Sequence, residues 1–279
     1  MDAAVRDAAI AAEPDRYLAA TLAPRQAQRP LAILAAFTAE LARIPATVSE
    51  PMLGSIRLQW WRDTLEAAPA GQRSGHPIAD ALADITNSHH LDVKLLLAMV
   101  DAREFDLSGA LHSDDRGLFA YLEATQAHPF RLALAILDVP VSLGDELASA
   151  AGRAYGLARA LSRMPMLLHN GGLPLTADRL RAAGCDPTEL TASSIPLRTA
   201  AAVASTAEAL AVLTRAEHDK VRSLWPRLPP KARPALLPLA MVEPYLGLNR
   251  PLEPLERMSQ VSPLTRVARI GLAYMTGRT

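Results

Sequence analysis

The chain has 279 residues, of which 50% are apolar and 4% aromatic, so it can build a sizeable core. Lys plus Arg and Asp plus Glu both number 29, and this balance argues against a nucleic-acid partner. The single cysteine, Cys185, excludes an intrachain disulfide. A membrane-spanning helix needs about 18 apolar residues in a row, and neither such a run nor a secretory signal is present. We therefore expect a cytoplasmic protein.

Ala- and Leu-rich segments separated by prolines and turn residues predict an all-α chain, because these residues are good helix formers. Short helices are expected over 2–12 and 15–22, which makes 1–24 a candidate peripheral segment of a single domain covering 1–279. A long helix over 25–44 should end at Pro45. Later helices are expected over 51–67, 77–87, 92–107, 115–137, 145–168, 195–223, 231–246 and 263–276.

The helix over 51–67 contains two adjacent tryptophans in the stretch "IRLQWWRD". Trp61 shares an apolar stripe with Leu58 and Leu65, which predicts a core position. Trp60 lies about 100° further round the helix and must point elsewhere. We expect Trp60, together with Arg57 and Arg62, at the mouth of a cavity or on a partner surface, with ordinary packing as the alternative.

Acidic residues in "DAREFD" raise the possibility of a metal site. Asp101 and Glu104 are three residues apart and can share a helical face. Two carboxylates on one face can hold a hard cation such as Mg²⁺. The alternative is a solvated face on which Arg103 compensates the negative charge.

Several segments, taken in order, resemble the squalene/phytoene synthase family. They are "RPLAILAAFTAELARI", "SEPMLGSIRLQWWRDTLE", "DAREFDL", "AYLEATQAHPFRLALAIL" and "AGRAYGLARALSRMPMLLHNGGLPL". The resemblance implies an isoprenoid-synthase-like helical bundle around a central cavity. It also implies a transferase that joins two prenyl diphosphates head to head. In that chemistry two Asp-rich helical motifs hold Mg²⁺, which stabilises the diphosphate leaving group.

The chain departs from the family pattern at both Asp-rich motifs. In the first motif the expected acid positions carry Ala42 and Ala46. In the second, Arg163 fits the motif's arginine, but Met164 stands in place of its aspartate. Because both metal clamps are missing together, we expect a chain without a bound metal cofactor that has lost the ionisation step.

The same departures resemble a branch of this family that acts in the assembly of respiratory complex I. The resemblance implies an assembly or scaffolding factor, with a respiratory-complex subunit as partner, peripheral on the inner face of a membrane. Two alternatives stay open. One is a Mg²⁺-dependent prenyltransferase with a rearranged site. The other is a module that binds an isoprenoid or lipid. The residues for these alternatives are Glu40, Asp101, Glu104 and Asp106 for catalysis, and Arg43, Arg57 and Arg163 for ligand binding.

Overall fold

The computed structural model describes residues 2–68, 71–170, 174–191, 196–250 and 260–279, and every regular element within these ranges is helical. The expected all-α architecture is confirmed. The elements in chain order are α1 (Ala3–Ala12), α2 (Pro14–Thr21), α3 (Arg25–Thr47), α4 (Pro51–Ala67), α5 (Pro77–Ser88), α6 (Val93–Asp101), α7 (Glu104–Leu107), α8 (Asp115–Leu122), the π-turn η2 (Glu123–Ala127), α9 (His128–Ile136), α10 (Val141–Ser162), α11 (Met164–Asn170), α12 (Ala177–Ala182), the 3₁₀ segment η3 (Pro187–Thr191), α13 (Leu197–Leu224), the 3₁₀ segments η4 (Trp225–Arg227) and η5 (Pro230–Met241), α14 (Val242–Leu246) and α15 (Pro263–Thr276).

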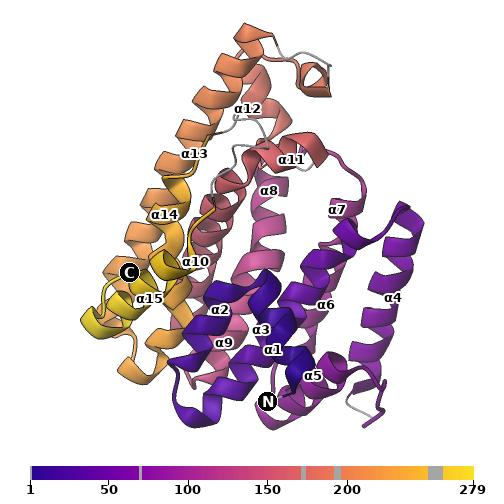
Figure 1. Ribbon diagram of the computed structural model, residues 1–279, viewed down its shortest axis with the longest axis vertical. Coiled ribbons are helices and arrows are strands. Elements are labelled where there is room, and N and C mark those ends of the chain that lie inside the picture. Colours follow the sequence, from indigo (N-terminus) through magenta and orange to yellow (C-terminus); the bar gives the residue numbers. More distant parts are fainter. Residues whose placement is uncertain (1, 69–70, 171–173, 192–195, 251–259) are drawn as a thin grey trace.

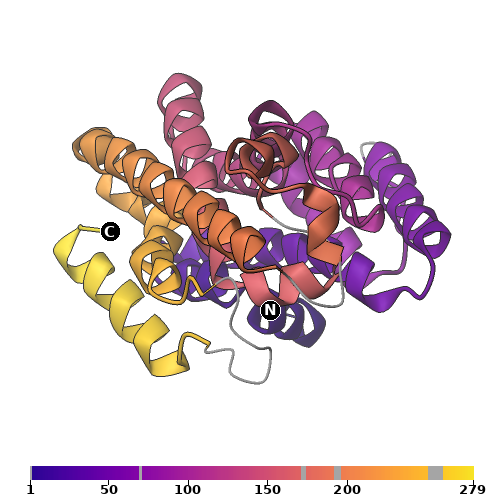
Figure 2. The same ribbon diagram turned by 90° about the horizontal axis from the view of Figure 1, so that it is seen from above.

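Two long helices, α10 and α13, pack side by side, and α8 and α9 lie on the other side of α10 (Figure 1). Helix α4 forms the opposite edge of the molecule, and α15 lies at the periphery when the bundle is seen from above (Figure 2). The core is made mainly of Leu and Ala side chains, as the composition predicts.

Helix α3 carries an apolar stripe at three- and four-residue spacing, and all of its members are buried: Leu31, Leu34, Phe37, Leu41 and Ile44. The expectation that Pro45 ends this helix is wrong, because α3 continues to Thr47. A proline in the last turn removes only one hydrogen bond of the helix, and the Thr47 hydroxyl donates to the Ile44 carbonyl at 3.2 Å. Ala42 and Ala46 therefore stay on one helix, one turn apart.

The helix expected over 115–137 is interrupted by the π-turn η2, just before Pro129. A proline cannot donate a backbone hydrogen bond, which favours a local change of helical register. The turn places Ala127 against α10. A Cβ atom added at Gly152 would lie 2.5 Å from the Ala127 backbone, so only glycine fits there.

Three further boundaries differ from those expected, and prolines account for the first of them. Pro234 and Pro238 turn the expected helix over 231–246 into the 3₁₀ segment η5 followed by α14. The segment expected as one helix over 92–107 breaks between Asp101 and Glu104 into α6 and α7. At Arg163 the chain leaves α10 and starts α11.

Residues 1–24 were expected as a peripheral segment, but α2 begins inside the bundle. Glu13 and Asp15 are fully buried, and Arg16 is nearly so. The two carboxylates pair with arginines from distant helices, and Asp15 also accepts hydrogen bonds from two tyrosines, which allows charged groups into the interior. Among the helices of the described part of the chain, none combines the length and apolarity needed to cross a bilayer.

Candidate functional site

The first Asp-rich motif position lies at the C-terminal end of α3. Ala42 is half-buried and Ala46 is exposed, and both offer only methyl groups where the family pattern expects carboxylates. Arg43 lies between them and forms an exposed ion pair with Glu40 at 3.1 Å. A methyl group cannot ligate a hard cation, so these positions contribute no oxygen ligand to Mg²⁺.

The second motif position lies where α10 passes into α11. Met164 is completely buried and Arg163 is exposed. Arg159, one helical turn before Arg163, is the main cause of a lowered pKa at Arg163. The position thus holds a thioether and two neighbouring positive charges. Within the described ranges, no group of three or more His, Cys, Asp or Glu side chains is arranged to hold a metal ion.

Asp101 and Glu104 come together, but an arginine lies between their carboxylates. Arg62 from α4 binds Asp101 at 2.6 Å and Glu104 at 3.0 Å. The Ser55 hydroxyl also donates to Glu104, at 2.9 Å. A cation already fixed between two carboxylates competes with Mg²⁺ for the same oxygens.

Asp106 belongs to a separate, partly buried group on α7 and α8. Arg103 binds it at 2.9 Å and the Tyr121 hydroxyl donates to it at 2.7 Å. Burial alone would lower the pKa of the Arg103 guanidinium, but Tyr121 and Asp106 raise this pKa well above its ordinary value. The Arg103 guanidinium therefore stays charged and keeps Asp106 occupied.

The adjacent tryptophans take the two directions that the sequence predicts. Trp61 is 4% exposed and packs edge-on against Phe37 with ring centroids 5.1 Å apart. Trp60 is 39% exposed and lies 5.4 Å from the His76 ring. Arg62 is not beside Trp60 on the surface, because it turns towards Asp101.

Two of the three expected ligand-binding arginines share a surface hollow of about 310 Å³ with Trp60. The hollow is lined by Glu40, Arg43, Ile44, Thr47, Arg57, Trp60, Trp61 and His76. Arg57 donates to the Thr47 hydroxyl at 2.8 Å. The third arginine, Arg163, is absent from this lining and lies at the junction of α10 and α11.

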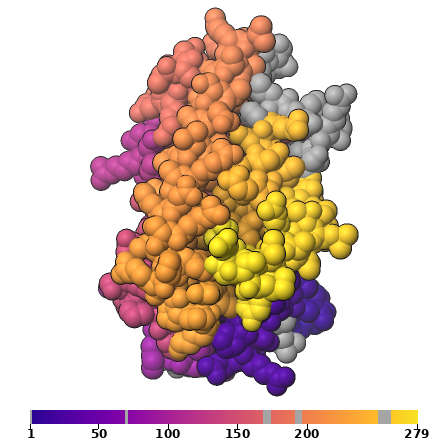
Figure 3. All heavy atoms as spheres, turned by 90° about the vertical axis from the view of Figure 1, so that its left-hand side faces the viewer, coloured from indigo at the N-terminus to yellow at the C-terminus, as the bar shows by residue number. Residues whose placement is uncertain are grey.

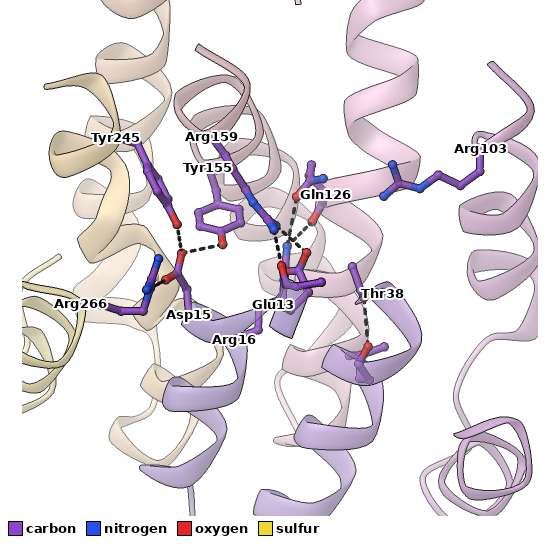
Figure 4. Close-up of polar contacts among 12 residues, drawn as sticks. Glu13, Asp15, Arg16, Thr38, Arg103, Gln126, Tyr155, Arg159, Tyr245 and Arg266 are labelled. Carbon is purple, nitrogen blue, oxygen red and sulfur yellow. Dashed lines mark hydrogen bonds and ion pairs between the residues drawn. The ribbon is translucent and has the colours of Figure 1, made fainter. Parts of the chain in front are cut away.

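A buried ionic network, which sequence reasoning missed, joins the start of α2 to α10. Glu13 accepts from Arg159 at 2.5 Å and from Arg16 at 3.2 Å (Figure 4). Burial alone would raise the pKa of the Glu13 carboxyl, but the charges of Arg159 and Arg16 outweigh it and lower this pKa. The guanidinium of Arg16 also lies 4.2 Å from the centre of the Phe130 ring.

Asp15 extends the network to α14 and α15. Its carboxylate accepts from the Tyr155 hydroxyl at 2.8 Å and the Tyr245 hydroxyl at 2.6 Å, and it pairs with Arg266 (Figure 4). Burial, followed by the negative charge of Asp15, raises the pKa of Tyr245 to about 12. Both tyrosines therefore remain protonated donors. We call Glu13, Asp15, Arg16, Tyr155, Arg159, Tyr245 and Arg266 the interior network.

The interior network ties helices together and leaves little free space beside it. A hollow of about 20 Å³ lies among α2, α3, α9 and η5, with Arg16 in its wall. This volume accommodates roughly one water molecule. Both acids at the start of α2 already hold arginine partners, so the network has the features of a structural clamp.

The helix arrangement defines the class of the protein as an all-α bundle of the isoprenoid-synthase type. It is similar to the crystal structure of squalene synthase HpnC from Alicyclobacillus acidocaldarius, with a TM-score of 0.73 and 17% identity over 87% of this chain and 90% of that one. It is also similar to a dehydrosqualene synthase, with a TM-score of 0.75 and 15% identity over 98% of this chain and 97% of that one. At these identities the likeness establishes the fold alone.

The family follows from the sequence. Residues 11–250 match the profile described as squalene/phytoene synthase, and the chain belongs to this family. This confirms the resemblance inferred from the motifs.

Curated relatives carry the name "NADH dehydrogenase (ubiquinone) complex I, assembly factor 6". The rat protein is 33% identical over 151 residues, which are 54% of this chain and 45% of that protein. The human protein is 32% identical over 149 residues, which are 53% of this chain and 45% of that protein. The homologue from Drosophila melanogaster is 28% identical over 83% of this chain and 70% of its own length. The chain thus spans about half the length of the mammalian relatives it matches.

Proposed function

We propose that this chain is a catalytically degenerate member of the squalene/phytoene synthase family that acts as an assembly factor for respiratory complex I. The observation that carries the proposal is the loss of acids at both motif positions. Ala42, Ala46 and Met164 supply no oxygen ligand for a metal. A metal that stabilises a diphosphate leaving group contributes several kcal/mol, and each 1.4 kcal/mol is about tenfold in rate. A chain that lacks this metal keeps the helical bundle but does not catalyse the condensation.

The acids that remain support the same conclusion. Arg62 engages Asp101 and Glu104, and Arg103 engages Asp106. Glu40 offers one carboxylate, which Arg43 already binds. A rearranged Mg²⁺ site would have to displace an arginine from each carboxylate before it could form. The proposed function therefore needs no metal cofactor.

The assembly role draws on the names of the relatives and on the retained scaffold. Proteins named complex I assembly factor 6 match this chain at 28% to 33% identity. We place the protein in the cytoplasm at the inner face of the membrane, where a subunit of the respiratory complex would be its partner. The interior network keeps the helices in a fixed arrangement, which suits a protein that offers a binding surface to a partner and does not catalyse a reaction.

Deletion of the gene in the source organism tests the role. We expect the amount of assembled complex I on native gels, and NADH:quinone activity of the membranes, to fall together. A plasmid copy should restore both, and a copy carrying Asp101→Ala should restore them equally well, because the proposed role needs no acid there. Unchanged complex I in the deletion strain would contradict the proposal.

A further inference from the structure

Helix α15 exposes an apolar stripe on the side that faces away from the bundle. Ile270 and Ala273 are buried against the protein. The exposed stripe consists of Leu264 at 82%, Val267 at 56%, Tyr274 at 51% and Met275 at 77% exposure. Their spacing of three, seven and one residues places them on one helical face. Large apolar side chains gathered in this way on a surface are typical of a docking site.

Positive charge accompanies this stripe. Residues 260–279 contain Arg266, Arg269 and Arg278 and no acidic residue. Arg266 points inward to Asp15 and fixes α15 to the interior network. The other two arginines are exposed: Arg269 lies on α15 three residues after Arg266, and Arg278 lies just past the C-terminal end of the helix.

A hollow of about 520 Å³ lies between α13 and α15 and is lined by three arginines, Arg222, Arg269 and Arg278. No acidic side chain is among its described lining residues. Arg222 has an acid, Asp219, at 3.6 Å, whereas the described residues offer Arg269 and Arg278 no ion-pair partner. Guanidinium groups bind phosphate oxygens in a bidentate manner. Figure 3 shows α15 in yellow beside α13 in orange on this face of the molecule.

We propose that α15 and the three-arginine hollow form a docking surface for an anionic phospholipid bilayer. The apolar stripe enters the boundary between headgroups and acyl chains, and the arginines of the hollow hold headgroup phosphates. Helices with apolar and basic faces side by side lie in this way in the membrane interface. Tyrosine is also favoured at that depth, because its ring is apolar and its hydroxyl stays hydrated. The proposal deepens the membrane location given above and rests on it.

Charge complementarity favours a lipid surface over a second copy of this chain. A second copy would bring a surface with the same unpaired arginines against the first, and like charges repel. An anionic leaflet instead attracts each arginine near its surface. The interior pairing of Arg266 with Asp15 means that α15 is already folded and oriented before it meets the membrane.

Sedimentation of the purified chain with lipid vesicles tests the proposal. We expect binding to vesicles of phosphatidylcholine mixed with phosphatidylglycerol, weaker binding at high salt, and little binding to phosphatidylcholine alone. The double substitution Arg269→Gln/Arg278→Gln should weaken binding about 25-fold, since each arginine near the surface contributes about 1 kcal/mol, or about fivefold. Leu264→Ser/Met275→Ser should weaken binding at least about tenfold while leaving the charge unchanged.

Matched controls separate this surface from general charge and apolarity. Arg25→Gln/Arg29→Gln removes two exposed arginines from α3, and Met52→Ser/Ile56→Ser removes two exposed apolar side chains from α4. Both control pairs should bind vesicles like the unsubstituted chain. Circular dichroism and thermal unfolding should show that all four variants are folded.

Four results would overturn the proposal. The first is equal binding, or no binding, to the two vesicle types. The second is an equal loss of binding in the test and control pairs. The third is binding of inorganic phosphate without vesicle binding, lost in Arg269→Gln/Arg278→Gln, which would assign the hollow to a free anion. The fourth is a dimer that forms without lipid and dissociates in Leu264→Ser/Met275→Ser. Because the vesicle experiment involves no respiratory complex, its failure leaves the deletion experiment as an independent test of the assembly role.

Discussion

Removal of the negative charge of Glu13 should destabilise the protein strongly. Glu13 is 1% exposed and pairs with two nearly buried arginines, Arg159 at 2.5 Å and Arg16 at 3.2 Å. In Glu13→Gln the side-chain shape is kept, but both guanidinium groups lose their counter-ion. Breaking a buried ion pair on one side costs about 3–5 kcal/mol. That is a large fraction of the roughly 5–15 kcal/mol by which a folded protein is stable.

Urea unfolding followed by circular dichroism at neutral pH measures this loss as a change in the free energy of unfolding. The control is Glu40→Gln, which removes an ion pair of similar length whose arginine is 53% exposed. Exposed pairs contribute about 0–1 kcal/mol, so this control should be nearly neutral.

The pH dependence adds a second readout for Glu13. Its pKa is lower in the folded state, so its contribution is present above the unfolded pKa of about 4.3 and is lost as pH falls through the folded value. Glu13→Gln should flatten the stability curve in that acidic range. Equal and small losses in Glu13→Gln and Glu40→Gln would refute the reasoning, because they would mean that water reaches Arg159 and Arg16.

Three further predictions concern other parts of the bundle. Burial lowers the pKa of His218 to about 4, so the folded state is favoured while this histidine is neutral. About 3 kcal/mol of the free energy of unfolding should therefore be lost as pH falls from about 6.5 to 4. His218→Leu should remove this pH dependence from acid unfolding curves. Trp61→Ala should lower the free energy of unfolding in urea by about 3–5 kcal/mol, because Trp61 is buried. Trp60→Ala, at the rim of the surface hollow, should lower it by about 1 kcal/mol or less. Equal losses would contradict the directions assigned to the two side chains. Gly152→Ala should lower stability by about 1–3 kcal/mol, because the added methyl group would meet the Ala127 backbone. An unchanged unfolding midpoint would instead show that α10 and η2 can move apart without cost.

Much of the fold follows from apolar periodicity. The stripe on α3 and the burial of Trp61 both result from 3/4 spacing, which depends only on local sequence. Some of the boundary errors occur at prolines, whose effect depends on their place in the helix. Pro45 is tolerated in the last turn of α3, and Pro129 is preceded by a π-turn. How strongly a proline disturbs a helix depends on tertiary packing, and the local sequence pattern carries no information about that packing.

The interior network could not be predicted in the same way. Tyr155 and Arg266 meet Asp15 across separations of 140 and 251 residues. The only local signals were two acids flanking Pro14, and Tyr155 and Arg159 one helical turn apart on α10. Arg57, by contrast, could be placed near Trp60, because the two residues are three apart on α4. The position of Arg163 could not be predicted, since it depends on where α10 ends.

The most direct test of the account is an assay for prenyl diphosphate condensation. The purified chain is incubated with farnesyl and geranylgeranyl diphosphate and Mg²⁺, beside an active dehydrosqualene synthase as positive control. Released pyrophosphate and any C30 or C40 hydrocarbon are then quantified. The account predicts neither above background, because Ala42, Ala46 and Met164 provide no ligands for the metal. Mg²⁺-dependent formation of such a product, lost in Asp101→Ala, would contradict it.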